Sequence, residues 1–422
     1  MKKISDYINE FGLESFKERA YDFTKNFENS CILDSCSLHT GVNAGKYDFL
    51  AAYGAEQIVQ DLDSLQQCLD SHSNWVFGTL GYELKNKFEN LSSSNTALYK
   101  TQPVDFFVPE AILSIDKSGK TKLLKGKLPE EFWSCQMKTQ KTSVSSVSSP
   151  VNRQIYLDKI DEIHELIRAG EVYELNYCVP FSHSYSSFNP SDFQKELIKK
   201  SPVPMASFYK NGPTSLCGAS MERFLAKTGD TLTSQPIKGT IRKGSDSAED
   251  QEMIKELESS QKDKAENVMI VDLVRNDLAR ISESGSIKVS ELFGIYSYLQ
   301  VHQMISTVQS KLKKGLKFSD ILYAAFPMGS MTGAPKIAAM KYIEILESFQ
   351  RGWYSGSTGY ISPDGDFDFN VVIRSVICDE INNKIHYCAG GAITIDSIPE
   401  EEWNEVRLKT KAITEMLNDS SY

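Results

Sequence analysis

The sequence lacks the features of a secreted or membrane-spanning protein. It contains no apolar run long enough to cross a bilayer, and even the stretch 267–274 is interrupted by Asp272. Lys2 and Lys3 open the chain, but no apolar segment follows them, so we expect no secretion signal. These absences predict a cytoplasmic protein.

The sequence also lacks Cys-x-x-Cys pairs and an excess of positive charge. The eight cysteines are scattered without a Cys-x-x-Cys pair, which argues against a disulfide framework or a zinc knuckle and favours reduced thiols. The net charge of −10 disfavours general binding to nucleic acids or anionic membranes. An anionic substrate would therefore need a local basic pocket.

The chain does contain enough apolar material for a large core. Its composition, 41% hydrophobic and 24% charged, is that of an ordinary globular protein, and its length suits roughly two to three domains. A Ser/Thr-rich stretch at 139–150 is typical of an exposed loop. We therefore expect an N-terminal α/β region at 1–138 that contributes to a shared core, this loop, and a catalytic region at 151–422.

Hydrophobic periodicity after this loop predicts the fold class. A helix closed by Gly170 is marked by apolar residues three and four positions apart: Tyr156, Ile160, Ile163 and Ile167. Alternation over 173–181 predicts a half-buried strand. Further strands are expected at 215–227, 356–361, 370–378 and 385–395, and further helices at 247–268, 335–349 and 398–417. Because the strands come in adjacent groups with helices between the groups, an α+β fold with antiparallel sheets is favoured.

One lysine has an unusual sequence environment. Lys238 lies in Pro236-Ile237-Lys238-Gly239-Thr240, which we interpret as a tight apolar turn after a strand end at 232–235. Partial desolvation there would lower the lysine pKa and free its amine to act as a nucleophile. An ordinary solvated lysine is the commoner explanation of such a segment taken alone.

Two pairs of acids stand three residues apart on expected helices. Asp263 and Glu266 come at the end of one helix, and Glu402 and Glu405 lie in the C-terminal helix, with Lys409 four residues further on. Such pairs could converge on one Mg²⁺ ion, which prefers oxygen ligands. Solvated acidic turns are the alternative explanation.

Three further segments carry polar chemistry. The run 397–400 predicts a capping box with proline in the first helical turn. The Gly-rich loop 326–336 opens a helix whose free amides suit a carboxylate or phosphate, although its spacing is not that of a Walker A loop, and a structural turn remains the alternative. Arg374, expected in a strand on the same side as Val372 and Val376, would be either a buried ion pair or a carboxylate clamp.

In this order the motifs resemble those of the chorismate-utilising enzymes, which include anthranilate, aminodeoxychorismate, isochorismate and salicylate synthases. The resemblance covers about 151–417 and lies in SMERF at 220–224, PIKGT at 236–240, DKAEN at 263–267, VDLVRNDLARI at 271–281, MGSMTGAPK at 328–336, RGWYSG at 351–356, IR at 373–374, GG at 390–391 and DSIPEEEWNEVRLK at 396–409. It implies large antiparallel sheets packed as a sandwich core and flanked by helices. The first 135 residues match the family only loosely, for instance at 32–35. A further hypothesis is that this N-terminal region keeps an amino-acid pocket like the tryptophan site of relatives, which a titration with tryptophan tests.

The resemblance also implies roles for site residues. Glu266 and Glu405 would ligate Mg²⁺ directly, Asp263 and Glu402 would reach it through water, and the metal would hold the ring carboxylate of chorismate. Tyr354 and Arg374 would bind the enolpyruvyl carboxylate, helped by the backbone at Gly390 and Gly391. Thr332 and Lys409 would lie nearby. Glu222 would be the general acid that protonates the departing C4 hydroxyl.

Lys238 distinguishes the branches of the family. Anthranilate synthases carry alanine there, whereas in aminodeoxychorismate synthases the lysine adds to chorismate C2 as the C4 hydroxyl leaves, and ammonia then adds at C4 and expels it. The resemblance therefore implies that the chain makes 4-amino-4-deoxychorismate for 4-aminobenzoate and folate synthesis. Because the sequence has no Gly-x-Cys-x-Gly elbow, ammonia would come from a separate glutamine amidotransferase. An anthranilate synthase large subunit and a non-catalytic chorismate-binding subunit are the alternatives.

Two positions depart from the family pattern. Gln303 occupies the place of a histidine that is tied to pyruvate elimination in anthranilate synthases, and His302 sits one residue earlier, as a structural residue or with a shifted role. Glu174 stands where ammonia-using members commonly have glutamine. A glutamate there adds negative charge near an anionic substrate.

Overall fold

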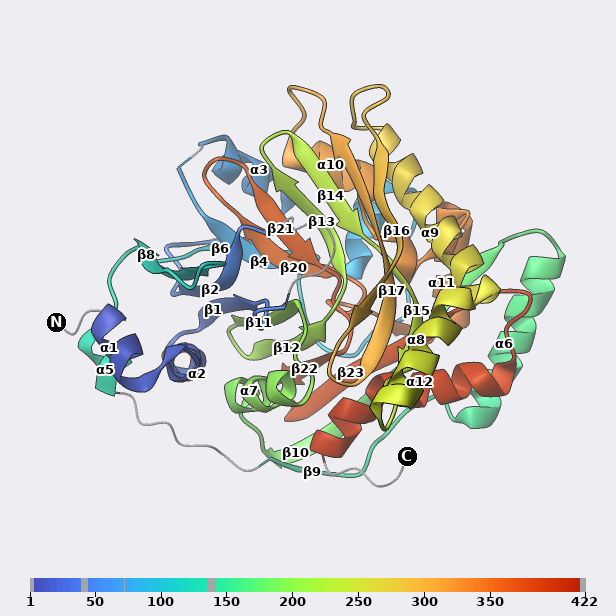
Figure 1. Cartoon of the computed structure of the whole chain (residues 1–422), viewed down its shortest axis with the longest axis horizontal. Coiled ribbons are helices and arrows are strands. Elements are labelled where there is room, and N and C mark those ends of the chain that lie inside the picture. The colour runs from blue at the N-terminus through green and yellow to red at the C-terminus, as the bar shows by residue number, and fades with distance from the viewer. Residues whose placement is uncertain (1–3, 39–44, 72, 135–141, 418–422) are drawn as a thin grey trace.

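The computed structural model describes residues 4–38, 45–71, 73–134 and 142–417, and two large antiparallel sheets form its centre (Figure 1). The first sheet has the spatial order β18 (Gly333–Ala334), β10 (Glu174–Ser187), β23 (Lys384–Ile393), β22 (Ser375–Asp379), β12 (Thr214–Ser220), β11 (Met205–Asn211), β1 (Asn29–Asp34), β2 (Tyr47–Tyr53), β7 (Ala111–Asp116) and β8 (Thr121–Lys125), with β9 (Ser143–Val144) beside β10.

The second sheet has the order β15 (Ile237–Arg242), β17 (Val301–Lys311), β14 (Thr231–Gln235), β13 (Arg223–Thr228), β21 (Phe367–Asn370), β20 (Ser357–Ile361), β4 (Val76–Leu80), β6 (Val104–Val108) and β3 (Gln57–Val59), with β16 (Lys288–Ser297) beside β17. A short parallel pair joins β5 (Thr96–Ala97) to β19 (Phe349–Gln350). Both sheets combine strands from before and after the loop predicted at 139–150. Of this loop, 139–141 lie outside the described residues, and the remainder contains β9.

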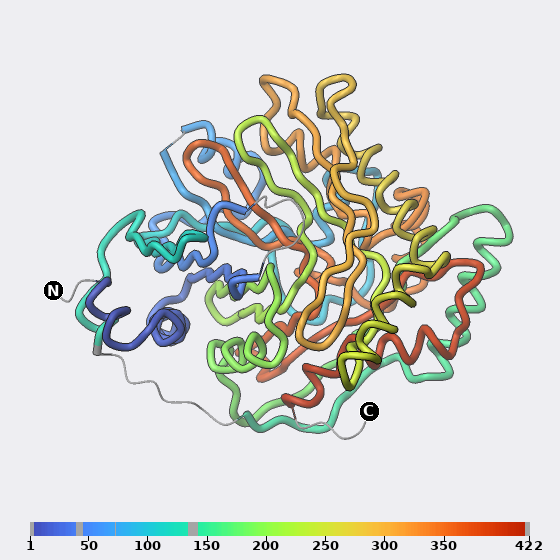
Figure 2. Tube along the Cα trace, viewed as in Figure 1, coloured from blue at the N-terminus to red at the C-terminus, as the bar shows by residue number. Residues whose placement is uncertain are grey.

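Helices cover the outer faces of the two sheets. Those with buried residues in the core of the first sheet are α1 (Ile4–Phe11), α2 (Leu13–Phe23), α5 (Glu130–Ser134), α6 (Arg153–Arg168), α7 (Pro190–Lys200), α11 (Lys336–Leu346) and α12 (Pro399–Met416). Those on the second sheet are α3 (Leu62–Asp70), α4 (Lys85–Phe88), α8 (Ser247–Ser259), α9 (Gln261–Ala279) and α10 (Phe318–Ala325). Short 3₁₀ turns form at η1 (Thr24–Asn26), η2 (Tyr82–Leu84) and η3 (Gly329–Met331). Figure 2 shows α12, in red, beside α6, which it contacts.

The sheets are held face to face by an apolar layer between them. Its buried members include Cys31, Leu50, Phe77, Phe107, Tyr209, Leu216, Trp353 and Ile377. Burying side chains of this size contributes about 1.5–3 kcal/mol each relative to exposure. Strands with one side facing this layer and the other facing helices are buried on both sides, as in β1 and β4. The predicted α+β sandwich flanked by helices is confirmed.

Four local predictions differ from the structure. The helix expected at 247–268 is two helices, because Ser260 is non-helical and its side chain accepts a hydrogen bond from the Asp263 amide to cap α9. The strand expected at 370–378 is interrupted between β21 and β22. The strand expected at 215–227 is divided into β12 and β13. β10 is buried on both faces of its first half instead of one, because its second face borders the space between the sheets.

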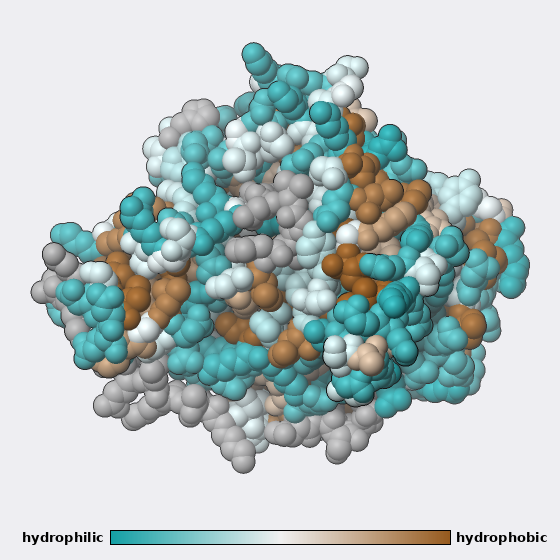
Figure 3. All heavy atoms as spheres, viewed as in Figure 1, coloured by the Kyte–Doolittle hydropathy of each residue, from teal (hydrophilic) through white to brown (hydrophobic). Residues whose placement is uncertain are grey.

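No helix in the described part of the chain is long and apolar enough to cross a bilayer. On the face drawn in Figure 3, hydrophobic residues lie in separate patches among hydrophilic ones. Singly exposed apolar residues of this kind are normal on globular proteins.

Candidate active site

A cavity of about 1170 Å³ lies between the two sheets, and most of the predicted site residues line it. The β10, β23 and α12 segments form one side, and β15, β17 and α9 form the other. Ten of the twelve predicted residues are on its wall: Glu222, Lys238, Asp263, Glu266, Tyr354, Arg374, Gly390, Glu402, Glu405 and Lys409. The structure thus brings together side chains that are far apart in the sequence.

Lys238 extends into this cavity from the edge strand β15. A bulge between Ile237 and Thr240 interrupts the ladder with β17, and Gly239 has a φ of +95°, which favours glycine. The lysine side chain is 10% exposed, and its Nζ donates a hydrogen bond to Oε1 of Glu174 at 2.7 Å. The segment is therefore a bulged strand and not the tight turn predicted.

The protonation state predicted for Lys238 is wrong. Burial by itself lowers the lysine pKa, but the negative charges of Glu174, Glu266 and Glu405 raise it, and the net effect is a pKa above the ordinary value. Local sequence could not reveal this effect, because Glu174 reaches the amine from the opposite sheet. The surrounding carboxylates therefore favour the ammonium form of Lys238, and nucleophilic attack requires that it first lose a proton.

Glu222 has the properties of a general acid. It follows β12 and is 5% exposed, and burial raises its pKa to about 7, against the opposing effects of the Ser330 hydroxyl, the Lys238 charge and the Ile237 amide. Because a carboxyl with this pKa keeps much of its proton near neutral pH, Glu222 can donate it to a leaving group.

The two acid pairs face each other across the cavity. Asp263 and Glu266 lie in the first turns of α9 and not at a helix end as predicted, while Glu402 and Glu405 lie on α12. Burial raises the pKa of Glu266 to about 7 and also raises the pKa of Glu402. Lys409 forms an ion pair with Glu405 and lowers the pKa of that carboxyl.

The start of α12 also differs from the prediction. Ser397 does not cap the helix through a capping box; its hydroxyl donates instead to Glu402 Oε1 at 2.8 Å. Pro399 does occupy the first turn, and Glu400 forms an exposed ion pair with Arg153. Ser397 therefore orients one of the cavity acids.

The four acids have the donor chemistry of a Mg²⁺ site. In the described residues, no group of three or more metal-binding side chains is gathered closely enough to enclose an ion. A Cβ atom added to Gly391 would nevertheless lie 3.1 Å from Glu402 Oε2 and 3.7 Å from Glu405 Oε1, so only glycine keeps this space open beside the carboxylates. Carboxylate oxygens around such a space fit a hard cation that retains water ligands.

Two groups on the wall can bind a carboxylate. Tyr354 is 3% exposed, with its hydroxyl 3.6 Å from the Cys178 thiol. Arg374 lies between β21 and β22 with a φ of +51°, so it is not in the strand predicted, and Val372 and Val376 pack in different parts of the core. Its Nη1 donates to the Lys409 carbonyl at 3.1 Å, and burial lowers its pKa although it remains a cation.

The remaining predicted residues take supporting positions. Thr332 is fully buried behind the wall, and its hydroxyl bonds to the carbonyls of Met328 and Gly329. Lys409 donates to the Gly390 carbonyl at 2.8 Å. The start of α11 does not line the cavity, so the anion site predicted for its amides does not face the other site residues.

The two departures from the family pattern have distinct surroundings. His302 is fully buried and bonded to Ser297 at 2.7 Å and to Asp250 at 2.9 Å, which makes it a structural residue. Gln303 points the other way, lines the cavity, and accepts a hydrogen bond from Thr240 at 2.9 Å while donating to the Met221 sulfur at 3.0 Å.

Sequence reasoning missed several residues of the wall. Ser330, Asn176 and Lys262 line the cavity, and Asn176 Nδ2 donates to the Ser330 carbonyl at 3.0 Å. Asn176 could have been found from the strand alternation, since it shares a face of β10 with Glu174. Ser330 and Lys262 adjoin recognised motifs but carry no separate signal.

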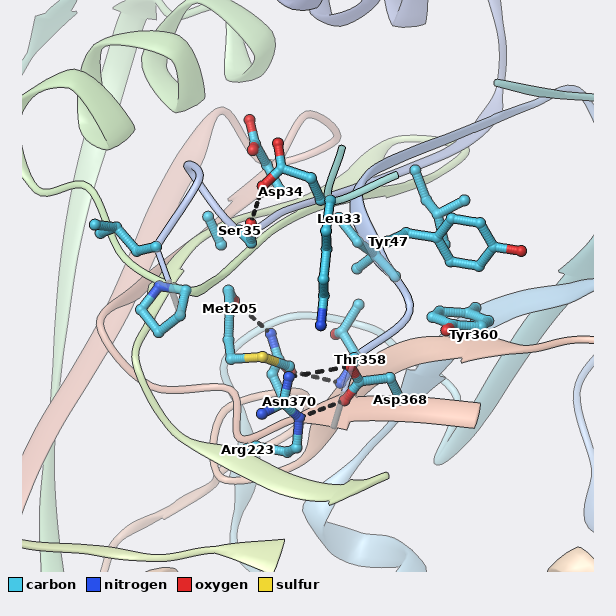
Figure 4. A pocket seen from close by; sticks show the side chains of 17 residues that line it. Leu33, Asp34, Ser35, Tyr47, Met205, Arg223, Thr358, Tyr360, Asp368 and Asn370 are labelled. Atoms are coloured by element: carbon cyan, nitrogen blue, oxygen red, sulfur yellow. Dashed lines mark hydrogen bonds and ion pairs between the residues drawn. The ribbon is translucent and has the colours of Figure 1, made fainter. Parts of the chain in front are cut away.

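A second cavity, of about 610 Å³, lies in the N-terminal half of the sandwich (Figure 4). Leu33, Asp34 and Ser35 line it, which are three of the four residues at the loosely matching stretch 32–35. Asp34 accepts from the buried Lys17 at 2.9 Å. Arg223, on the opposite wall, pairs with Asp368 at 2.8 Å. The hypothesis of an amino-acid site here stays a prediction.

Known proteins resemble this chain over most of its length. A family model described as chorismate binding enzyme matches residues 28–415. The chain is 31% identical to aminodeoxychorismate synthase component 1 of Escherichia coli (strain K12) over 398 residues, which is 87% of each chain. It is 42% identical to the chloroplastic aminodeoxychorismate synthase of Arabidopsis thaliana over 264 residues, which is 62% of this chain and only 28% of that longer protein.

A solved structure also matches. The crystal structure of anthranilate synthase component I from Streptococcus pneumoniae TIGR4 superposes with a TM-score of 0.77 at 25% identity, covering 89% of this chain and 94% of that one. The range matched by the family model, residues 28–415, includes both sheets and every residue on the cavity wall. On these grounds the chain belongs to the chorismate binding enzyme family.

Proposed function

We propose that the chain is an aminodeoxychorismate synthase component I, which converts chorismate and ammonia to 4-amino-4-deoxychorismate for 4-aminobenzoate and folate synthesis. The observation that carries this proposal is the presence of a buried lysine amine and a buried carboxyl of raised pKa, Lys238 and Glu222, on one cavity wall. Replacing a hydroxyl by an amine at one carbon through two allylic shifts needs a nucleophile and an acid in this arrangement. Relatives named aminodeoxychorismate synthase support it.

Chorismate carries two carboxylates, and the cavity offers a place for each. Arg374 and Tyr354, with the backbone at Gly390 and Gly391 and the nearby Lys409, would hold the enolpyruvyl carboxylate. An arginine at such a site gives both charge and directional donors.

The ring carboxylate would lie beside the acids. Glu266 and Glu405 would hold Mg²⁺ directly, and Asp263 and Glu402 would hold it through water. Bound there, Mg²⁺ would bind the ring carboxylate and offset the charges of Glu266 and Glu405, two of the three acids that raise the Lys238 pKa.

The covalent steps use three side chains. Glu174, hydrogen-bonded to Lys238 at 2.7 Å, takes a proton from its ammonium group. The neutral amine then forms a bond to chorismate C2, the ring double bond shifts, and the C4 hydroxyl leaves as water with the proton of Glu222. Ammonia next adds at C4, the double bond shifts back, and the C2–nitrogen bond breaks to release Lys238. The Glu222 carboxylate accepts the proton that the new amine loses, so the sum is chorismate and ammonia to aminated product and water.

The proposal also includes a partner protein, a cytoplasmic location and a division of the chain into three regions. A separate glutamine amidotransferase would supply ammonia, as the name component 1 of the E. coli relative implies for that protein. The seven described cysteines are all free, which supports a reducing, cytoplasmic setting. The region 151–422 would carry the chemistry, the loop 139–150 would connect it, and 1–138 would complete the two sheets.

The second candidate is a non-catalytic chorismate-binding subunit. The raised pKa of Lys238 favours it, because a lysine in its charged form binds an anion but does not attack carbon. An anthranilate synthase is less well supported, since Lys238 and Gln303 replace the residues that branch uses.

Product analysis tests these candidates. The purified chain is mixed with chorismate, Mg²⁺ and an ammonium salt, and the product is identified by mass and fluorescence. A non-fluorescent product that keeps its enolpyruvyl group and has an amine in place of the hydroxyl supports the proposal. Fluorescent anthranilate would identify the other branch, and chorismate binding without turnover would identify the binding subunit.

A further inference from the structure

A small side cavity adjoins the chorismate cavity at Glu222. It encloses about 360 Å³ between α9, β14, the end of α10 and η3. The two cavities share two wall residues, Glu222 and Ser330. The two cavities therefore lie on either side of these two residues.

The walls of the side cavity suit a small neutral molecule. They are mostly apolar: Phe224, Leu225, Pro236, Ile270, Val274, Leu278, Ala325 and Met328. Of the charged groups on them, Asp277 is paired with Lys336 and Arg223 with Asp368, and Glu222 lies at the junction with the main cavity. Away from this junction an ammonium ion would lose its hydration without finding an unpaired counter-charge, whereas ammonia would lose little.

Ser330 provides a polar group at the junction. It is 7% exposed, and its hydroxyl lies near enough to the Glu222 carboxyl to lower the pKa of that carboxyl, but it makes no hydrogen bond of normal geometry to any group of the described residues. A buried hydroxyl without a partner is costly unless a ligand or water completes it. Its position is fixed, because Asn176 binds its carbonyl and a Cβ on the preceding Gly329 would come within 2.2 Å of Leu273.

We propose that ammonia reaches chorismate C4 through this side cavity and is bound at the junction by the Ser330 hydroxyl. The inference rests on the proposed function, in which Glu222 faces C4 and chorismate fills the main cavity. Ammonia then enters on the side from which water has left. It forms the C4–nitrogen bond and gives the excess proton to the Glu222 carboxylate, which lost one when the hydroxyl departed.

Variants that narrow the side cavity test this route. Val274→Phe on α9 and Ala325→Leu on α10 add bulk to the wall of the side cavity, and Ser330→Ala removes the junction hydroxyl. Val268→Phe is the matched control, since Val268 is on the same helix, 43% exposed and outside the side cavity. Steady-state amination is measured with varied ammonium chloride at fixed pH, and chorismate affinity is measured by calorimetry.

We expect each of the three variants to lower kcat/KM for ammonia about tenfold, since the path of the second substrate is altered. Chorismate affinity should stay unchanged in the control and in the two variants that lie outside the main cavity, Val274→Phe and Ala325→Leu. Unchanged ammonia kinetics in the variants that fold would overturn the route and leave the proposed function intact. An increase in the hydroxylated by-product alone, with ammonia kinetics unchanged, would show a water path and also overturn it. If the wild-type chain aminates no chorismate at all, the proposed function fails and the route fails with it.

Discussion

Glu174 and Lys238 form an ion pair that joins the two sheets across the cavity. Glu174 begins β10 of the first sheet, Lys238 lies on β15 of the second, and the carboxylate and amine are 2.7 Å apart with side chains only 4% and 10% exposed. A glutamate in place of the glutamine that is common in ammonia-using members therefore acts directly on the proposed nucleophile. It stabilises the charged amine and is also the nearest base that can remove its proton.

Replacing this carboxylate should lower the lysine pKa. In Glu174→Gln the largest raising influence on the Lys238 pKa is lost while burial, which lowers it, remains. Below its pKa an amine is protonated and unreactive, so the pH at which Lys238 becomes reactive should fall. The measurement is the rate of Lys238 acylation against pH, without added metal, read by peptide mass. The exposed Glu162→Gln serves as control, and an unchanged midpoint in Glu174→Gln would contradict the coupling.

Glu222 should set the alkaline limb of the reaction. Burial raises its pKa to about 7, so the carboxyl is protonated below that pH and loses its proton as the pH rises through it. Measured at constant concentration of neutral ammonia, kcat should fall above about pH 7, and Glu222→Gln should lower it by about 10²–10⁴-fold. A flat profile from pH 6 to 9 in the wild type, or near-normal activity of the variant, would remove Glu222 from the role of acid.

Gly391→Ala should weaken Mg²⁺ binding. The added methyl group would lie 3.1 Å from a Glu402 oxygen and 3.7 Å from a Glu405 oxygen, in the space that the carboxylates border. We expect calorimetric Mg²⁺ affinity to fall about tenfold, equivalent to 1.4 kcal/mol, while thermal stability without metal changes little. Asp263→Asn and Glu402→Gln should weaken binding less than Glu266→Gln. Equal affinity in Gly391→Ala and wild type would place the ion elsewhere.

A buried ion pair should dominate the stability of the loop that carries Tyr354. Arg351 donates to both carboxylate oxygens of Glu347, at 2.9 and 2.6 Å, and both side chains are 1% exposed. Arg351→Ala leaves Glu347 buried without its partner and should cost about 3–5 kcal/mol of the free energy of unfolding. Arg275→Ala, in an exposed pair, should cost about 0–1 kcal/mol. Similar denaturant midpoints for the two variants would contradict this ranking.

Local patterns predicted much of the fold, and the family resemblance predicted ten of the residues on the cavity wall. Tyr156, Ile160 and Ile163 are buried on α6 as their spacing required, and the acid pairs converge as their motifs implied. Long-range electrostatics could not be predicted. The charge state of Lys238 depends on Glu174, which is 64 residues away and on the other sheet.

Unusual backbone conformations and the adjacency of two cavities could not be predicted from the sequence either. Arg374 leaves the strand because its φ is +51°, a conformation that alternation of side chains does not reveal. The position of the Ser330 hydroxyl between two cavities could not be predicted, because α9 and η3 border the second cavity only in the folded structure.

The most direct test of the central claim compares the products of the wild type and Lys238→Ala. Each protein is incubated with chorismate, Mg²⁺ and an ammonium salt, and products are separated and weighed, with chorismate affinity measured in parallel. If Lys238 adds to C2, the wild type should form 4-amino-4-deoxychorismate, and the variant should bind chorismate without forming it. Amination by Lys238→Ala at the wild-type rate would contradict the covalent role of the lysine and the function built on it.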